Sequence, residues 1–241
     1  MFFNKNVEGD IGYYKLEGWW LETFTKDERK KIEGVYKPMG GDANRKPLTE
    51  GKIESSSQSK AFFLSTLAGW FNNPRNRSIA NKIVEKAEEV IEENPSDDLT
   101  PYFVYSEMIS IYYAQRENVE MLNKAIQACK KQIKIGPLTK VALRKDYEKS
   151  QIENRKCSKD PMMKELEVWN GTKYVAWKDY DFDSEFNKFS LPSHKGYEQL
   201  AIILNKQGKD DEAIKLCNEA KNQGWAGDWD KRIARYSKKK W

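Results

Sequence analysis

The stretch YEQLAIILNKQGKDDEAIKLCNEA, residues 197–220, places small residues at regular points among large apolar ones. Before Gly208 the apolar residues recur three and four apart, which is the period of one helical face, and Ala213, Cys217 and Ala220 repeat that spacing after it. Small residues let two helices approach closely where they cross, while large residues fill the gaps of the partner helix. The stretch therefore predicts two antiparallel helices joined by a short turn.

Two other parts of the chain carry a similar pattern. In residues 197–220 its slots are held by Tyr197, Leu200, Ala201, Leu204, Gly208, Ala213, Cys217 and Ala220. An upstream copy keeps alanine in all three alanine slots and consists of Leu64, Leu67, Ala68, Phe71, Arg75, Ala80, Val84 and Ala87. A weaker copy consists of Ser106, Ile109, Ser110, Tyr113, Leu122, Ile126 and Cys129. One such hairpin cannot bury its apolar face alone, so the copies predict hairpins that stack on their neighbours.

These slots resemble the tetratricopeptide repeat, a helix-turn-helix unit of about 34 residues. The sequence departs from that family at Cys217, where an aromatic residue is usual, and at Trp225, where proline is common. Its copies are also not contiguous. The resemblance implies an all-α fold of stacked antiparallel hairpins, a degenerate solenoid, with an irregular aromatic-rich insert. The whole chain is also similar to uncharacterised bacterial proteins that combine a WWLETFT segment with a C-terminal GDWDKRIAR, and this similarity brings no activity with it.

Composition shifts along the chain predict four regions. Residues 1–57 form a Trp-rich segment that we expect to pack on the repeats, and Thr25 and Glu28 within it have capping-box spacing. Residues 58–160 form the helical repeat region, and residues 161–192 form the aromatic-rich insert, which is either functional or packed by its own rings. Residues 193–241 contain the last hairpin and a helix expected to cover its open end.

Recognisable catalytic and metal-binding patterns are missing from the sequence. No phosphate-binding glycine motif occurs, the three cysteines are far apart, and His194 is the only histidine and stands where a helix should begin. Asp179, Asp181 and Asp183 alternate, but the loop lacks the glycine and glutamate that a calcium-binding EF-hand needs. We therefore expect no enzyme activity, no cofactor and no metal.

The chain shows neither a signal peptide nor an apolar run of about 18 residues that could span a membrane. Its separated cysteines fit a reducing compartment, so we expect a cytoplasmic protein without a membrane partner. The formal net charge of +5 is small for a nucleic-acid binder of 241 residues. Basic residues are nevertheless concentrated in 138–159 and at the C-terminus, where they either solvate helix faces or contact an anion.

The leading functional interpretation is a scaffold or adaptor that binds an unknown protein or peptide in a concave helical groove. Variable first-helix positions are the candidate contacts: Glu198, Ile202, Asn205, Glu107, Ile111, Ser65 and Asn72. The Lys and Asn of the carboxylate clamp found in some relatives of the family are replaced by the pairs Glu198 and Ile202, Ser65 and Gly69, and Glu107 and Ile111, so no clamp is expected. The alternative is nucleic-acid contact by the basic C-terminus and by residues of the basic helix, Arg144, Lys145, Lys149 and Arg155.

Overall fold

The chain is described by a computed structural model for residues 7–38, 46–96, 98–158, 167–169, 173–176, 179 and 188–238. It divides into two compact units, and the described parts of each are treated separately below. Unit 1 comprises Met1–Ser96 and Thr100–Ala128, and unit 2 comprises Asp97–Leu99 and Cys129–Trp241. The division falls inside one helix, within the range 58–160 that the sequence predicts as a single region.

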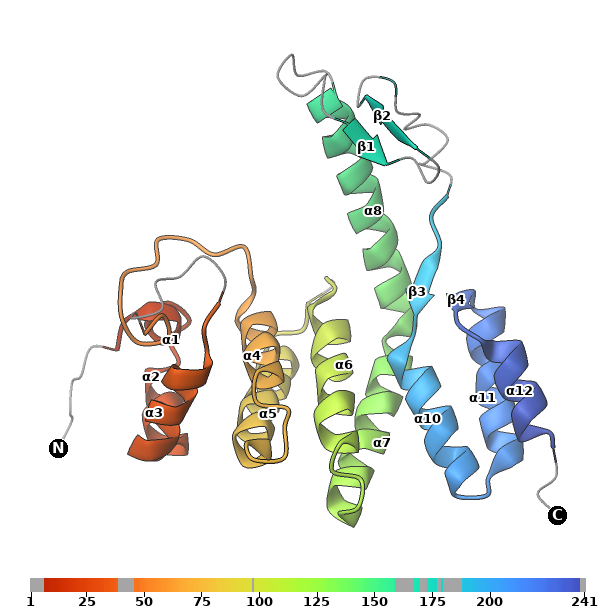
Figure 1. The fold of residues 1–241 in the computed structure, drawn as a ribbon, viewed down its shortest axis with the longest axis horizontal. Coiled ribbons are helices and arrows are strands. Elements are labelled where there is room, and N and C mark those ends of the chain that lie inside the picture. The colour runs from red at the N-terminus through yellow and green to blue at the C-terminus, as the bar shows by residue number, and fades with distance from the viewer. Residues whose placement is uncertain are drawn as a thin grey trace. The chain divides into compact units, whose positions relative to one another are not determined.

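Unit 1 is helical throughout its regular elements (Figure 1). Its helices are α1 (Gly9–Tyr13), α2 (Glu17–Thr23), α3 (Lys26–Val35), α4 (Lys60–Gly69), α5 (Arg77–Glu93), α6 (Thr100–Tyr113) and the first part of α7 (Val119–Lys134). Helices α4, α5 and α6 all pack against one another. The predicted capping box at the start of α3 is present, because Thr25 accepts a hydrogen bond from the backbone of Glu28 and Glu28 accepts one from the backbone of Thr25.

The helices before α4 contact α4 and α5 through aromatic and charged side chains. The ring of Tyr14 stacks on Phe63 of α4 with 4.8 Å between centroids, and its hydroxyl donates to the carbonyl of Gln58 at 2.9 Å. Lys82 of α5 forms an ion pair with Glu28 at 2.8 Å. Residues 7–38 therefore belong to the same packed body as α4 and α5.

The α4–α5 hairpin buries the residues that the repeat pattern predicts. Seven slots are fully buried: Leu64, Leu67, Ala68, Phe71, Ala80, Val84 and Ala87. Arg75, in the remaining slot, is exposed in the turn between the helices. The pattern of large and small residues thus identifies the face that each helix turns inward.

The register predicted for α6 and α7 is wrong by one residue. The buried residues of the equivalent slots are Tyr105, Met108, Ile109, Tyr112, Ala125 and Ala128, with Met121 half-buried where the other hairpins have alanine. The predicted slot residues Ile109 and Cys129 are fully buried, but the other five are only half-buried: Ser106, Ser110, Tyr113, Leu122 and Ile126. The register differs because the core is filled by tyrosine rings, Met108 and alanines. Ser110 stays outside this core, and its hydroxyl donates a hydrogen bond to the carbonyl of Ser106 at 3.0 Å.

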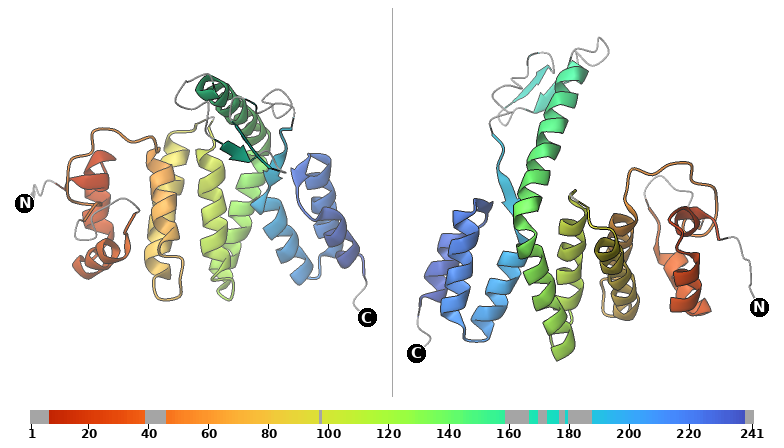
Figure 2. Two further views of the ribbon diagram at one scale, coloured as in Figure 1. Left: turned by 45° about the horizontal axis from the view of Figure 1, so that its top comes forward. Right: turned by 180° about the vertical axis from the view of Figure 1, so that it is seen from behind.

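Unit 2 combines helices with two small sheets. It contains the end of α7, then α8 (Gly136–Ser158), β1 (Glu167–Trp169), β2 (Tyr174–Ala176), β3 (Leu191–Ser193), α10 (Lys195–Lys206), α11 (Asp210–Asn222), β4 (Trp225–Ala226) and α12 (Trp229–Tyr236). Strands β1 and β2 pair antiparallel, whereas β3 and β4 pair parallel. Figure 2 shows α8 as one continuous helix. Much of the predicted insert, including Asp181 and Asp183, lies outside the described residues.

The α10–α11 hairpin has the predicted buried face. Tyr197, Ala201, Ala213, Cys217 and Ala220 form one core with three aromatic residues that follow α11, namely Trp225, Trp229 and Tyr236. The last two belong to α12, which packs against α11. The indole of Trp229 donates to the carbonyl of Trp225 at 2.7 Å, so its polar atom is satisfied inside this core.

Candidate functional site: the outer face of α4 and α6

One face of α4 and α6 is turned away from the core of unit 1. We call it the α4–α6 face and define it by its exposed or half-buried residues Phe62, Thr66, Gly69, Trp70, Phe103, Ser106, Glu107 and Ser110. On each helix these residues recur three and four apart, on the side opposite the buried slots. The face is therefore a consequence of the same helical period that builds the core.

Large aromatic side chains lie on this face. Phe62 and Phe103 each stand two residues before the first buried slot of their helix, and their rings meet edge to face with centroids 5.5 Å apart. Phe103 is 41% exposed. Trp70 is 39% exposed and contacts the ring of Tyr36 at 5.5 Å. Aromatic residues of this size contribute strongly to binding when a partner covers them.

Small residues lie between the aromatic ones. A Cβ atom on Gly69 would stand 3.4 Å from an oxygen of Glu107, so the glycine leaves room for that carboxylate between the two helices. Glu107 is half-buried. The face thus consists of aromatic rings with small residues, serine side chains and one glutamate between them.

The structure separates the predicted contact residues of unit 1 into two groups. Ser65 is 4% exposed and donates its hydroxyl to the carbonyl of Phe62, and Ile111 is fully buried, so neither can contact a partner. Both predictions fail because these residues point into the core. Glu107 and Asn72 are half-buried. With the corrected register, Ser106 and Ser110 take the positions that the sequence assigned to Glu107 and Ile111.

The other predicted contacts lie on α10, in unit 2. Glu198, Ile202 and Asn205 are all half-buried. The carboxylate of Glu198 lies 4.0 Å from Arg232, and the amide of Asn205 donates to Asp210 at 2.5 Å. Two of the three side chains therefore already have intramolecular partners.

Sequence reasoning missed the aromatic residues of the α4–α6 face. The signal that could have identified Phe62 and Phe103 was their equivalence, since both precede the first slot by two residues. The one-residue error in the register of α6 hid it. Trp70 was missed because it follows the last residue of α4 and fits no slot.

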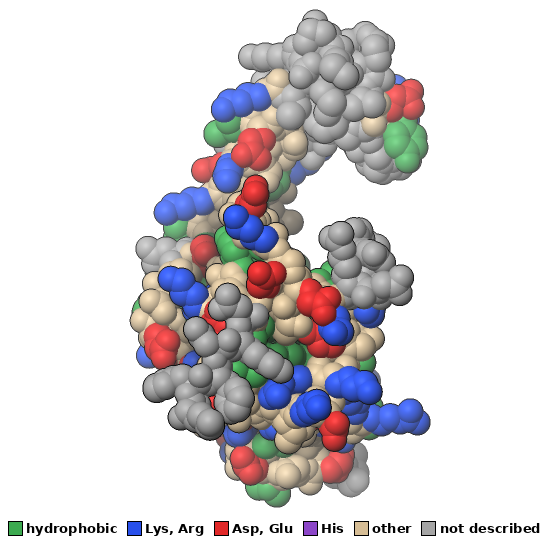
Figure 3. Space-filling view, turned by 90° about the vertical axis from the view of Figure 1, so that its left-hand side faces the viewer, with side chains coloured by type: hydrophobic (Ala, Val, Ile, Leu, Met, Phe, Trp, Pro, Cys, Tyr) green, Lys and Arg blue, Asp and Glu red, His purple; other side chains and the backbone are tan. Residues whose placement is uncertain are grey.

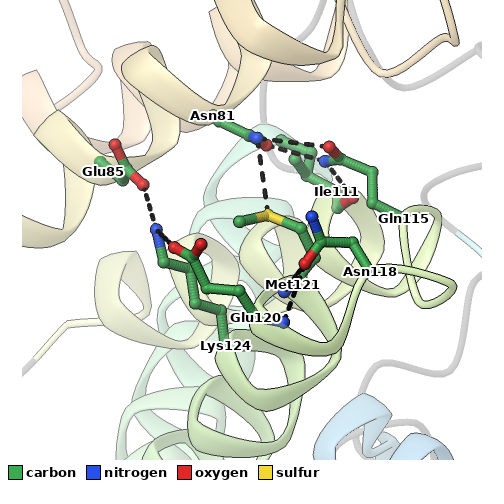
Figure 4. Close-up of polar contacts among 8 residues, drawn as sticks. All are labelled: Asn81, Glu85, Ile111, Gln115, Asn118, Glu120, Met121 and Lys124. Atoms are coloured by element: carbon green, nitrogen blue, oxygen red, sulfur yellow. Dashed lines mark hydrogen bonds and ion pairs between the residues drawn. The ribbon is translucent and has the colours of Figure 1, made fainter.

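A half-buried polar seam joins α5 to the end of α6 and to α7 (Figure 4). Asn81 and Gln115 exchange amide hydrogen bonds at 2.8 and 3.3 Å, and the amide of Asn81 also donates to the sulfur of Met121 at 3.6 Å. Lys124 bonds to Glu85 at 2.8 Å, and the same salt bridge raises the pKa of the Lys124 ammonium. These contacts hold α5 and α7 in one alignment, which is a structural role.

Of the predicted basic contacts, Arg144 is neutralised within α8 and Lys149 has only a marginal ion pair there. Arg144 pairs with Glu148 at 2.6 Å, and Lys149 lies 4.0 Å from Glu153. Lys145 is exposed, and the side chain of Arg155 lies outside the described residues. Basic and acidic side chains are also interspersed on the face drawn in Figure 3. Such a mixed surface attracts a phosphate backbone less strongly than a continuous positive surface does.

His194 and the two described cysteines are buried, and their surroundings indicate a role in the fold. Burial lowers the pKa of His194 to about 4, and its Nδ1 accepts a hydrogen bond from the backbone of Tyr197 as the N-cap of α10. Burial raises the pKa of the Cys129 thiol to about 12. Within the described ranges, no three His, Cys, Asp or Glu side chains gather as a possible metal site. No helix in the part of the chain described here is long and apolar enough to cross a membrane.

Searches of the chain against protein-family models, curated proteins and solved structures find no match in any of the three.

Proposed function

We propose that this protein is an interaction module of stacked, tetratricopeptide-like hairpins that binds a peptide segment of another protein on the α4–α6 face. One observation carries the proposal: Phe62 and Phe103, at equivalent positions of two hairpins, form an edge-to-face pair on that face, and Phe103 is 41% exposed. A repeated helical unit presents equivalent residues of successive first helices side by side. The Phe62–Phe103 pair lies on the first helices of two hairpins, where a repeat module is expected to contact its partner.

The energetics favour an apolar contact at this place. The exposed part of Phe103 corresponds to roughly 80 Å² of aromatic surface, given about 200 Å² for a whole aromatic side chain. Covering it would contribute about 2 kcal/mol at 25 cal/mol per Å². Trp70, with a similar exposed fraction of 39%, would contribute a comparable amount. Together the two side chains would contribute about 4 kcal/mol to a peptide contact, so further contacts must add to the affinity.

The test is selection of peptides from a phage-displayed random library on the purified full-length chain, followed by calorimetric titration of the enriched peptides. We expect enriched peptides with apolar or aromatic side chains and about tenfold weaker binding to each of the variants Phe103→Ser and Trp70→Ser. Val119→Ser is the matched control, because Val119 is also an exposed apolar residue, 73% exposed, but lies at the start of α7.

Thermal unfolding of each variant checks that the fold is retained. Peptides that bind Phe103→Ser and Trp70→Ser as tightly as the native chain would place the contact elsewhere. A library that yields no enriched peptide would remove the proposal.

A further inference from the structure

Helix α8, the longest helix described, has two unlike faces. On its inner face Thr139 is 3% exposed and Leu143 packs against the core of unit 2. A neighbouring side of the helix carries residues three, four and seven apart that share one line along it, and the buried Ala142 lies at the edge between the two sides. We call this line the outer stripe and define it by Leu138, Val141, Lys145, Lys149, Ile152 and Lys156.

The apolar members of the outer stripe are unusually exposed. Leu138 is 58% exposed, Val141 is 53% exposed and Ile152 is 50% exposed. The solvent side of a surface helix is normally polar, and a line of aliphatic residues at this spacing is typical of a helix that packs against another helix. Leu138 and Ile152 are separated by roughly 21 Å along the axis, at 1.5 Å per residue, or about four turns. The stripe is long enough for one partner helix.

The charged members of the outer stripe all have one sign. Lys145, Lys149 and Lys156 are exposed, and among the described residues neither Lys145 nor Lys156 forms an ion pair. Lys149 has only a marginal contact with Glu153, at 4.0 Å. The nearby Glu148 is paired with Arg144 at 2.6 Å and so does not offset the lysines. Whatever covers this stripe must therefore supply negative charge as well as apolar surface.

We propose that the outer stripe is a docking site for an acidic amphipathic helix of another protein. Apolar side chains of that helix would cover Leu138, Val141 and Ile152, and its Asp or Glu side chains would meet the three lysines. This mode of recognition uses apolar anchors three, four and seven residues apart. The stripe belongs to unit 2 and the α4–α6 face to unit 1, so this proposal does not rest on the function proposed above.

Two other anionic partners match the stripe less well. Phosphate backbones would engage the lysines but would leave three aliphatic side chains uncovered. An anionic membrane surface suits helices whose apolar and basic residues occupy different faces, whereas here lysines stand in the same line as the aliphatic residues. A helix with alternating apolar and acidic positions satisfies both kinds of residue together.

The test measures binding of labelled synthetic helices of about 19 residues, the number from Leu138 to Lys156, to the full-length chain by fluorescence anisotropy. The first probe has leucine at the apolar heptad positions and glutamate beside them, the second replaces every glutamate with lysine, and the third is a scrambled form of the first. We expect the glutamate probe to bind at least about tenfold more tightly than the other two.

Two sets of variants examine the two halves of the proposal. Combining Lys145→Glu, Lys149→Glu and Lys156→Glu should reverse the preference so that the lysine probe binds better. Combining Leu138→Ser with Ile152→Ser should weaken the glutamate probe about tenfold or more. All five residues are exposed, so the fold should persist, and circular dichroism checks it. Lys215→Glu, an exposed charge reversal on α11, should change nothing.

Three results would overturn the proposal. The first is absence of binding by the glutamate probe, and the second is equal binding of the glutamate and lysine probes. The third is binding of phosphatidylserine vesicles or of a thymidine oligonucleotide that the lysine reversals abolish, with no peptide binding. That third result would assign the stripe to a membrane or to nucleic acid instead.

Discussion

Replacing Gly196 with alanine should destabilise unit 2 although alanine is the better helix former. Gly196 is buried near the start of α10, and its N–H donates to the side-chain oxygen of Gln132 at 2.6 Å. A Cβ atom at this position would stand 2.9 Å from the carbonyl oxygen of Cys129 and 2.9 Å from that same Gln132 oxygen. Real Cβ atoms do not approach so closely, so α10 and the end of α7 must move apart.

The magnitude follows from two opposing effects. Overpacking of a well-packed core costs about 1–3 kcal/mol. The fully buried Gln132 side chain would also have to move, which would distort the hydrogen bond that it accepts from Gly196. Against this, alanine in place of glycine stabilises a helix interior by about 0.5–1 kcal/mol and by less in the first turn. We expect a net loss of about 1–2 kcal/mol in the free energy of unfolding, or a fall in Tm of about 3–6 °C.

The assay is urea unfolding followed by circular dichroism, with Gly34→Ala as the matched control. Gly34 is helical and exposed in α3, and a Cβ there would meet nothing within 4 Å, so that variant should gain stability. If the two units unfold separately, Gly196→Ala should move only the transition of unit 2. A Gly196→Ala protein as stable as the native chain would refute the close packing of α10 on α7.

Three further changes have defined outcomes. Gly9→Ala should destabilise unit 1 by about 3 kcal/mol in thermal unfolding, because φ is +61° and the Cβ would strike the carbonyl of Pro47. Asn81→Ala should cost about 1–2 kcal/mol by removing both hydrogen bonds between Asn81 and Gln115, although the Gln115 amide keeps its bond to the carbonyl of Ile111, and a double-mutant cycle with Gln115→Ala should show coupling of about 0.5–1.5 kcal/mol. His194→Asn, which can still cap α10, should remove a loss of stability on acidification. The pKa of His194 is about 6.5 in the unfolded chain and about 4 in the folded one, so between these pH values the unfolded state binds more protons. The free energy of unfolding of the native chain should therefore fall by up to about 3 kcal/mol as pH falls through this range. A variant whose stability depends on pH as that of the native chain does would contradict the burial of the imidazole.

The sequence predicts contact residues on the first helices of the hairpins, and the structure corrects two of them. A groove-like first-helix face was expected, yet Ser65 and Ile111 were assigned to it and are buried. For α6 the cause is visible in the residues, since Ile109 fits both the predicted and the observed register. Only neighbouring helices decide whether Tyr112 or Tyr113 turns inward.

The sequence alone determined the local part of this structure. The slots of the α4–α5 and α10–α11 hairpins, the Thr25–Glu28 capping box and the N-cap position of His194 follow from spacing, because residues three and four apart share a helical face and caps act within one turn.

Tertiary structure decided everything that joins distant residues. Gln132 bonds to Gly196 and Asn81 to Gln115 across separations of 64 and 34 residues, and no local periodicity encodes such pairs. The same holds for the exposure of Leu138 and Phe103. A helical pattern states that a residue lies on a given face, but only the packing of other elements determines whether that face is covered.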